Sequence, residues 1–110
     1  MSILDDIGGD KMRYQVIYKY ELVPGRNVLR LPFSSEILTT RVQGEPFSSP
    51  PAVVVWVKQF YPSGIDFDLL ENVELLLAQT GDEIPSKAKY IGTGEADNGI
   101  IWHVFEINRT

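Results

Sequence analysis

The feature that most constrains the fold is an alternation of period two in residues 13–22, which read RYQVIYKYEL. Aromatic or aliphatic residues occupy every second position: Tyr14, Val16, Tyr18, Tyr20 and Leu22. Polar residues fill most of the positions between them, and only Ile17 breaks the pattern. Because successive side chains of a β-strand point to opposite faces, this pattern predicts a strand with one buried face.

Further strand-like segments follow, and signals for turns and loops separate them. Pro24-Gly25 suits a type II turn, after which residues 28–32 are interpreted as a short returning strand, and Asn98-Gly99 favours a tight hairpin. The proline-rich residues 44–51 and the residues 61–71 are predicted to be exposed loops that carry partner contacts. Within the second loop, Asp66 could cap a single helical turn. The expected strands after the first cover residues 28–32, 36–44, 52–60, 73–81, 89–95 and 99–107.

This succession predicts an all-β fold, a single small antiparallel β-barrel or sandwich of about seven strands. We expect residues 1–12 to be a flexible lead-in and residues 13–110 to form one β domain. The length of 110 residues is enough for one core. The residues expected to be buried in it are Val53, Val55, Trp56, Leu75, Leu77, Ile101 and Phe105.

Composition excludes several classes of function. A net charge of −5 disfavours direct binding of nucleic acid through a basic patch. The absence of cysteine excludes disulfides, thiol catalysis and cysteine-ligated zinc. No segment approaches the roughly 18 consecutive apolar residues of a membrane span, so no membrane association is expected.

The only histidine, His103, lies in the last apolar segment. Alternation places it on one face with Ile101, Phe105 and Ile107. We expect a structural histidine, buried or half-buried, whose ring nitrogens are paired within the sheet or to a neighbouring loop. A catalytic role with a nearby carboxylate is the alternative, although no G-x-S-x-G elbow supports a triad.

Other candidate sites carry less weight. The acidic cluster in residues 66–71 lacks the spacing of a calcium loop, and residues 92–99 lack the G-x-G-x-x-G spacing of a nucleotide loop. We therefore predict no metal site, no cofactor and no catalytic residues. The aromatic residues are numerous for so small a sheet, and those at a rim would form a binding surface. The candidate binding residues are Trp56, Tyr90, Trp102 and His103.

Several short motifs, taken in order, resemble a family of small phage and prophage proteins known only as a domain of unknown function. The resemblance covers roughly residues 14–107. It implies a viral accessory or structural protein made in a bacterial cytoplasm. The motifs are Tyr18-Lys19-Tyr20, Leu31-Pro32, Thr80-Gly81 with Pro85, Tyr90-Ile91-Gly92-Thr93 and Trp102-His103-Val104-Phe105-Glu106.

The sequence thus favours a non-enzymatic phage or prophage accessory protein that binds a host factor or a small ligand, of the host-takeover or immune-evasion type. The main alternative is a virion or assembly component, such as a head or tail protein. A small enzyme that uses His103 is a third alternative. The expected location is the host bacterial cytoplasm or the virion, and self-association into a homo-oligomer is left open.

Overall fold

A computed structural model of the chain describes residues 13–43, 52–62 and 70–110. Every regular element in these residues is a β-strand, and no helix is present among them. The strands are β1 (Arg13–Leu22), β2 (Gly25–Pro32), β3 (Glu36–Gln43), β4 (Ala52–Pro62), β5 (Leu70–Gln79), β6 (Lys89–Glu95) and β7 (Ile101–Arg109).

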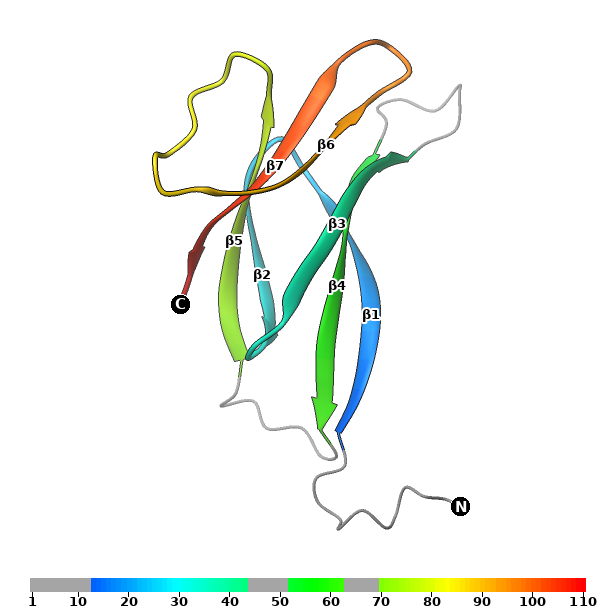
Figure 1. Ribbon diagram of the computed structural model, residues 1–110, viewed down its shortest axis with the longest axis vertical. Coiled ribbons are helices and arrows are strands. Elements are labelled where there is room, and N and C mark those ends of the chain that lie inside the picture. Colours follow the sequence, from blue (N-terminus) through cyan, green and yellow to red (C-terminus); the bar gives the residue numbers. More distant parts are fainter. Residues whose placement is uncertain (1–12, 44–51, 63–69) are drawn as a thin grey trace.

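The seven strands form two antiparallel sheets (Figure 1). One sheet has the order β1-β4-β3 and the other has the order β2-β5-β7-β6. The sheets pack face to face, and no ladder joins them into a closed barrel. The predicted all-β class and the number of strands are therefore confirmed, and of the two predicted architectures the chain adopts the sandwich.

The chain crosses between the sheets where the sequence suggested a simple return. The turn at Pro24 has Gly25 at φ 95°, as a type II turn requires, but β1 pairs with β4 and β2 pairs with β5. Asn27 secures this crossing, because its side chain accepts from the Val23 amide (2.8 Å) and donates to the Val23 carbonyl (2.9 Å). The interpretation of β2 as a strand returning alongside β1 is thus wrong.

The hairpin between β6 and β7 forms where Asn98-Gly99 predicted it. The Ala96 amide donates to the Ile100 carbonyl, and the Gly99 amide donates to the Ala96 carbonyl, each at 2.9 Å. Gly99 has φ 87°, so the loop is a three-residue turn that ends in a glycine bulge.

The core lies between the inner faces of the two sheets. It is built from aliphatic side chains at alternate positions of five strands: Leu22, Leu31, Val53, Val55, Val57, Val73, Leu75, Leu77 and Val104. Four of the predicted core residues, Val53, Val55, Leu75 and Leu77, are among them. The prediction was wrong for Trp56, Ile101 and Phe105, which are only half-buried because their positions alternate with the core positions of β4 and β7.

The loop predicted over residues 61–71 is shorter than expected at both ends. β4 continues to Pro62, and β5 already begins at Leu70. Glu71 is buried in β5, so no helical turn ends there. Asp66 and residues 44–51 lie outside the described residues, as does the predicted lead-in of residues 1–12.

β3 and β6, one from each sheet, pass close to each other along one side of the sandwich (Figure 1). Two glycines of β6 make this approach possible. A Cβ atom at Gly92 would lie 2.9 Å from Cγ2 of Thr40, and one at Gly94 would lie 2.9 Å from Cγ2 of Val42. These two glycines therefore allow the close packing of β6 against β3.

Candidate binding surface

A chain of four hydrogen-bonded side chains runs across the outer face of the four-stranded sheet. The Tyr90 hydroxyl is 2.5 Å from Oγ1 of Thr93. The same Thr93 oxygen is 3.0 Å from Nδ1 of His103, and Nε2 of His103 is 2.9 Å from Oγ1 of Thr80. Both ring nitrogens of His103 are thus paired, one within the sheet and one to the turn after β5, as the sequence analysis expected.

Local irregularities position the members of this chain. The register of β6 against β7 shifts between Tyr90 and Gly92, so Ile91 is an extra residue and Tyr90 and Thr93 share a face. Thr80 follows β5 in a turn closed by the Asp82 amide, which donates to the Gln79 carbonyl (3.0 Å).

The residues that follow Thr80, Gly81 and Asp82, stabilise the turn in which it lies. Gly81 adopts φ 99°, a conformation that glycine accepts without steric cost. The Asp82 carboxylate accepts from the Gln79 amide at 2.8 Å and closes the turn a second time. The Thr80 hydroxyl is therefore presented to His103 by a turn that is itself fixed.

A ring contact completes the surface. Tyr90 packs edge-on against Phe105, with ring centroids 5.7 Å apart and an angle of 64° between the planes. The register aligns Arg26, Leu76, Phe105 and Tyr90 in one row across all four strands. Although Tyr90 is 56% exposed, its ring is held by Phe105 and its hydroxyl by Thr93.

Hydroxyl partners determine what His103 can do chemically. A threonine hydroxyl can either donate or accept, so both nitrogens of His103 remain satisfied in either tautomer. Among residues 13–43, 52–62 and 70–110, no carboxylate is hydrogen-bonded to the ring. The same residues contain no group of three or more metal-ligating side chains that could hold an ion.

The structure brings together two of the four predicted binding residues. Tyr90 and His103 lie on the outer surface described above. Trp102 points the other way, is partly buried against the core, and has an Nε1 atom that is buried without a hydrogen-bond partner in the part of the chain that the structure describes. Trp56 lies on the outer face of the other sheet, opposite Lys19 of β1 and Thr39 of β3.

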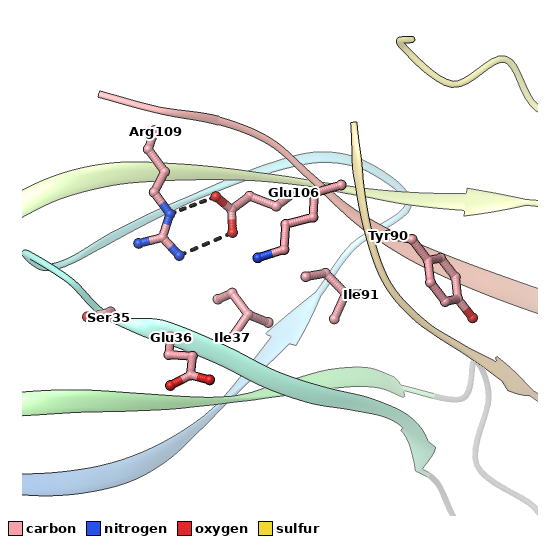
Figure 2. A pocket seen from close by; sticks show the side chains of 8 residues that line it. Ser35, Glu36, Ile37, Tyr90, Ile91, Glu106 and Arg109 are labelled. Atoms are coloured by element: carbon pink, nitrogen blue, oxygen red, sulfur yellow. Dashed lines mark hydrogen bonds and ion pairs between the residues drawn. The ribbon is translucent and has the colours of Figure 1, made fainter. Parts of the chain in front are cut away.

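A pocket of about 330 Å³ lies between the start of β3 and the strands β6 and β7, and Tyr90 is one of the residues that line it (Figure 2). Figure 2 shows Glu106 and Arg109 projecting from β7 toward it, while the Tyr90 ring points away. The residues that line the pocket are Ser35, Glu36, Ile37, Lys89, Tyr90, Ile91, Glu106 and Arg109.

Ion pairs occupy one wall of this pocket. Arg109 donates to both carboxylate oxygens of Glu106 (2.7 and 3.1 Å) and to Glu71 (3.0 Å). The hydrogen bond with Glu106 is the largest factor that raises the pKa of Arg109; the charges of Glu106 and Glu71 also raise it, and burial opposes them. This wall is consequently an ion-pair cluster in which one arginine bridges two carboxylates and ties the last strand to β5.

Sequence reasoning missed Thr80, Thr93 and Phe105 as members of the surface. The sequence nevertheless carried a signal for this surface. The short motifs at residues 80–81, 90–93 and 102–106 contain all five of the side chains that form it. Strict alternation, however, placed Tyr90 and Thr93 on opposite faces, and only the bulge at Ile91 reunites them.

Comparison with known proteins places the chain in a family. Residues 13–110 match the profile of the domain of unknown function DUF7352, so the chain belongs to this uncharacterised family. Neither a curated protein nor a solved structure matched it. No helix in the described residues is long and apolar enough to span a membrane.

Proposed function

We propose that this protein is a non-enzymatic binding module whose contact surface is the part of the outer face of the four-stranded sheet formed by β6, β7 and the turn after β5. The observation that carries the proposal is the state of Tyr90, an exposed aromatic ring that is nonetheless held in place by Phe105 and Thr93. The partner we propose is a protein, because exposed tyrosines are common anchors of protein–protein interfaces.

The energetics of binding favour such an arrangement. Immobilising a side chain in an interface costs roughly 0.5–1.5 kcal/mol. Tyr90 is already restrained at its ring and at its hydroxyl, so little of that cost remains when a partner covers it. His103 and Thr80 extend the restraint to the adjoining strand and turn, which gives the partner a preorganised surface.

The geometry around His103 supports a positioning role over a catalytic one. In a Ser-His-Asp triad, one ring nitrogen faces the nucleophile and the other is oriented by a carboxylate. Here the second nitrogen is held by Thr93, which in turn is bonded to Tyr90. In this proposal the His103 ring therefore has a positioning role: it fixes the hydroxyl groups of Thr80 and Thr93 beside the Tyr90 anchor.

The biological role we propose is that of a phage or prophage accessory protein that acts on a host factor in the bacterial cytoplasm. The support is the resemblance of the motifs around Tyr90 and His103 to small phage proteins. A head or tail component is the competing role. Fractionation of infected cells separates the two, because a virion component sediments with purified particles and an accessory protein stays in the supernatant.

The proposed surface is tested by site-specific photocrosslinking in cells of the bacterial host. The photoreactive amino acid p-benzoylphenylalanine replaces Tyr90 in one variant and Val28 in the control. Val28 is a matched position, because it is also exposed (62%) and belongs to the edge strand of the same sheet. We expect one discrete protein adduct at position 90 and none at position 28.

Purified partner then allows affinity to be measured. Tyr90→Ala should weaken binding by ~10-fold or more, as the loss of an interface anchor does. Tyr90→Phe keeps the ring and its contact with Phe105, so its affinity should stay within about threefold of the wild type. Equal adducts at both positions, or unchanged binding by Tyr90→Ala, would contradict the proposal.

A further inference from the structure

The edge strands β3 and β6 are in close contact at one end and border a pocket at the other. The close contact lies where β6 carries glycine, since Gly92 and Gly94 lie against Thr40 and Val42. The pocket of about 330 Å³ lies beyond this contact, where both strands begin. Glycine lets two backbones approach closely, so the sheets close at one end of this side and stay apart at the other.

Two isoleucines form an apolar wall of this pocket. Ile37 of β3 and Ile91 of β6 both line it, and both also pack against the core. In Figure 2 their side chains lie in the space between the two strands. The pocket therefore offers apolar contact to a short aliphatic chain.

The two carboxylates of the lining already have cationic partners. Arg109 donates to both oxygens of Glu106, at 2.7 and 3.1 Å. Glu36 pairs with Lys58 of β4 at 3.2 Å, and Figure 2 shows its carboxylate directed away from Glu106 and Arg109. Neither carboxylate therefore depends on a ligand for a counter-ion.

Lys89, by contrast, is a lining cation without a counter-ion. It stands opposite Glu106 in the β6–β7 ladder, but both oxygens of Glu106 are bound by Arg109. Within the residues that the structure describes, the exposed Lys89 side chain forms no hydrogen bond and no ion pair. All three N–H donors of its ammonium group are thus available to a ligand.

Arg109 adds further donors to the same pocket. A guanidinium group has five N–H donors, and the hydrogen bonds of Arg109 to Glu106 and Glu71 use three of them. With Glu36 directed away, the lining charges of Lys89, Arg109 and Glu106 leave one positive charge in excess. Glu71, the other partner of Arg109, is not part of the lining.

We propose that this pocket binds a small carboxylate that carries a short aliphatic chain. The Lys89 ammonium group receives the carboxylate, and Ile37 and Ile91 contact the chain. Hydrogen bonds between ionised groups are roughly twice as strong as those between neutral groups, so the ionised acid is favoured over a neutral carbonyl compound. The volume of about 330 Å³ is near the lower limit of ligand pockets, which favours a small ligand over a long peptide.

Two kinds of molecule present this chemistry: a free aliphatic acid, and the C-terminal residue of a peptide with an aliphatic side chain. Isocaproate represents the first kind, and N-acetyl-leucine represents the second. The corresponding amides, isocaproamide and N-acetyl-leucinamide, are matched controls because they keep the shape and remove the charge.

The pocket can be tested separately from the proposed partner surface. Tyr90 is the one side chain that belongs to both, and its hydroxyl is bonded to Thr93 on the outer face. A titration of the protein alone therefore reports on the pocket whether or not the surface binds a protein partner.

The full-length protein is titrated with each probe at neutral pH, and its backbone amides are followed by heteronuclear NMR. We expect saturable shifts at residues 35–37 and 89–91, with a Kd on the order of 1 mM for at least one of the two acids. Each amide should bind at least ~10-fold more weakly than its acid. The acid that binds more tightly identifies the source of the carboxylate.

Lys89→Met tests the assigned cation, because methionine keeps an unbranched side chain and removes the ammonium group. Lys89 is exposed and has no partner in the described residues, so the variant should fold as the wild type does. It should bind the acid at least ~5-fold more weakly. Lys87→Met is the control, because Lys87 is also exposed but does not line the pocket, and its affinity should match that of the wild type.

Thermal unfolding provides a second measurement. No ladder joins β3 to β6 among the described strands, so a bound acid would connect the two sheets along this side. Saturating acid should therefore raise the midpoint of unfolding of the wild type and of Lys87→Met, and raise it less for Lys89→Met. Amides that bind as tightly as their acids, unchanged binding by Lys89→Met, or no saturable binding of either acid would overturn the proposal.

Discussion

Tyr90 and Thr93 lie three positions apart on β6, yet their side chains share one face and their hydroxyl oxygens are 2.5 Å apart. In a regular strand, residues three apart point to opposite faces. The extra residue Ile91 reverses the alternation between them, and Ile91 itself packs against the core. The bulge therefore serves both the outer surface and the interior.

The same device recurs on β7. Its register against β5 shifts between Glu74 and Leu75, which makes Ile107 the extra residue. Glu106 and Arg109, again three positions apart, are thereby able to form their ion pair. Each of these two side-chain pairs depends on a bulge, and removing either bulge would place the two side chains of its pair on opposite faces.

His103→Gln should lower the free energy of unfolding by ~1–2 kcal/mol and leave partner binding close to that of the wild type. The reason is that glutamine cannot reach Thr80 and Thr93 with the geometry of the imidazole ring. Urea titration and binding assays measure the two quantities. A variant with wild-type stability and lost binding would show that His103 itself contacts the partner.

Leu75→Ala should be more destabilising than Phe105→Ala, although phenylalanine is the larger side chain. Leu75 is fully buried in the core, so its truncation should cost ~2–5 kcal/mol. Phe105 is half-buried on the outer face, so we expect less than the ~3–5 kcal/mol typical of a buried phenylalanine. Urea unfolding of both variants under one condition checks the order.

Gly94→Ala should destabilise the sandwich by ~1–3 kcal/mol, because the new Cβ would lie 2.9 Å from Cγ2 of Val42. Adding Val42→Ala removes that methyl group and should recover part of the loss, although the Val42 amide nitrogen at 3.4 Å remains. A thermal unfolding cycle of the two single variants and the double variant measures the coupling. Purely additive effects would contradict the close approach.

Arg109→Met should cost ~3–5 kcal/mol, because it leaves the largely buried carboxylates of Glu71 and Glu106 without their cation. Arg26→Met is the matched control: the Arg26–Glu74 pair is exposed (61% and 23%), and its loss should cost ~1 kcal/mol or less. Chemical unfolding at neutral pH compares them, and equal losses would show that the Arg109 cluster contributes no more than a surface pair.

The raised pKa of Arg109 has a predictable sign in the pH dependence of stability. A base whose pKa is higher in the folded state contributes stability that is complete below its unfolded pKa. That contribution is lost only as the pH rises through the raised value. Arg109 should therefore stay charged, and its own titration should add no slope to the stability curve near neutral pH.

Strand positions could be predicted from the sequence because alternation and turn residues act locally. The run of residues 13–22 and the Asn98-Gly99 turn both produced the expected elements. Sheet partners were not predictable in this way, since the Pro24-Gly25 turn is compatible with either a hairpin or a crossing between sheets. Whether the chain turns back or crosses to the other sheet at Pro24-Gly25 depends on which distant strands cover the apolar faces of β1 and β2.

The candidate surface was predictable only in part, for a similar reason. Tyr90 and His103 are conspicuous as residue types, whereas Thr80 and Thr93 gain their role from positions that a turn and a bulge create. A bulge leaves no reliable mark on residue alternation. The two tryptophans were attractive candidates by size alone. The parity of its position directs Trp102 inward, and Trp56 lies on the other sheet because β4 pairs with β1 and β3.

The crossing at Pro24-Gly25 also has a consequence for how the chain folds during synthesis. β1 and β2 leave the ribosome first, but their ladder partners are β4 and β5, which follow many residues later. Contacts so distant in sequence delay folding, because a long loop must close before they form. The nascent amino-terminal half therefore has to remain unpaired until β4 emerges, and this interval is when the chain is most exposed to aggregation and to chaperones.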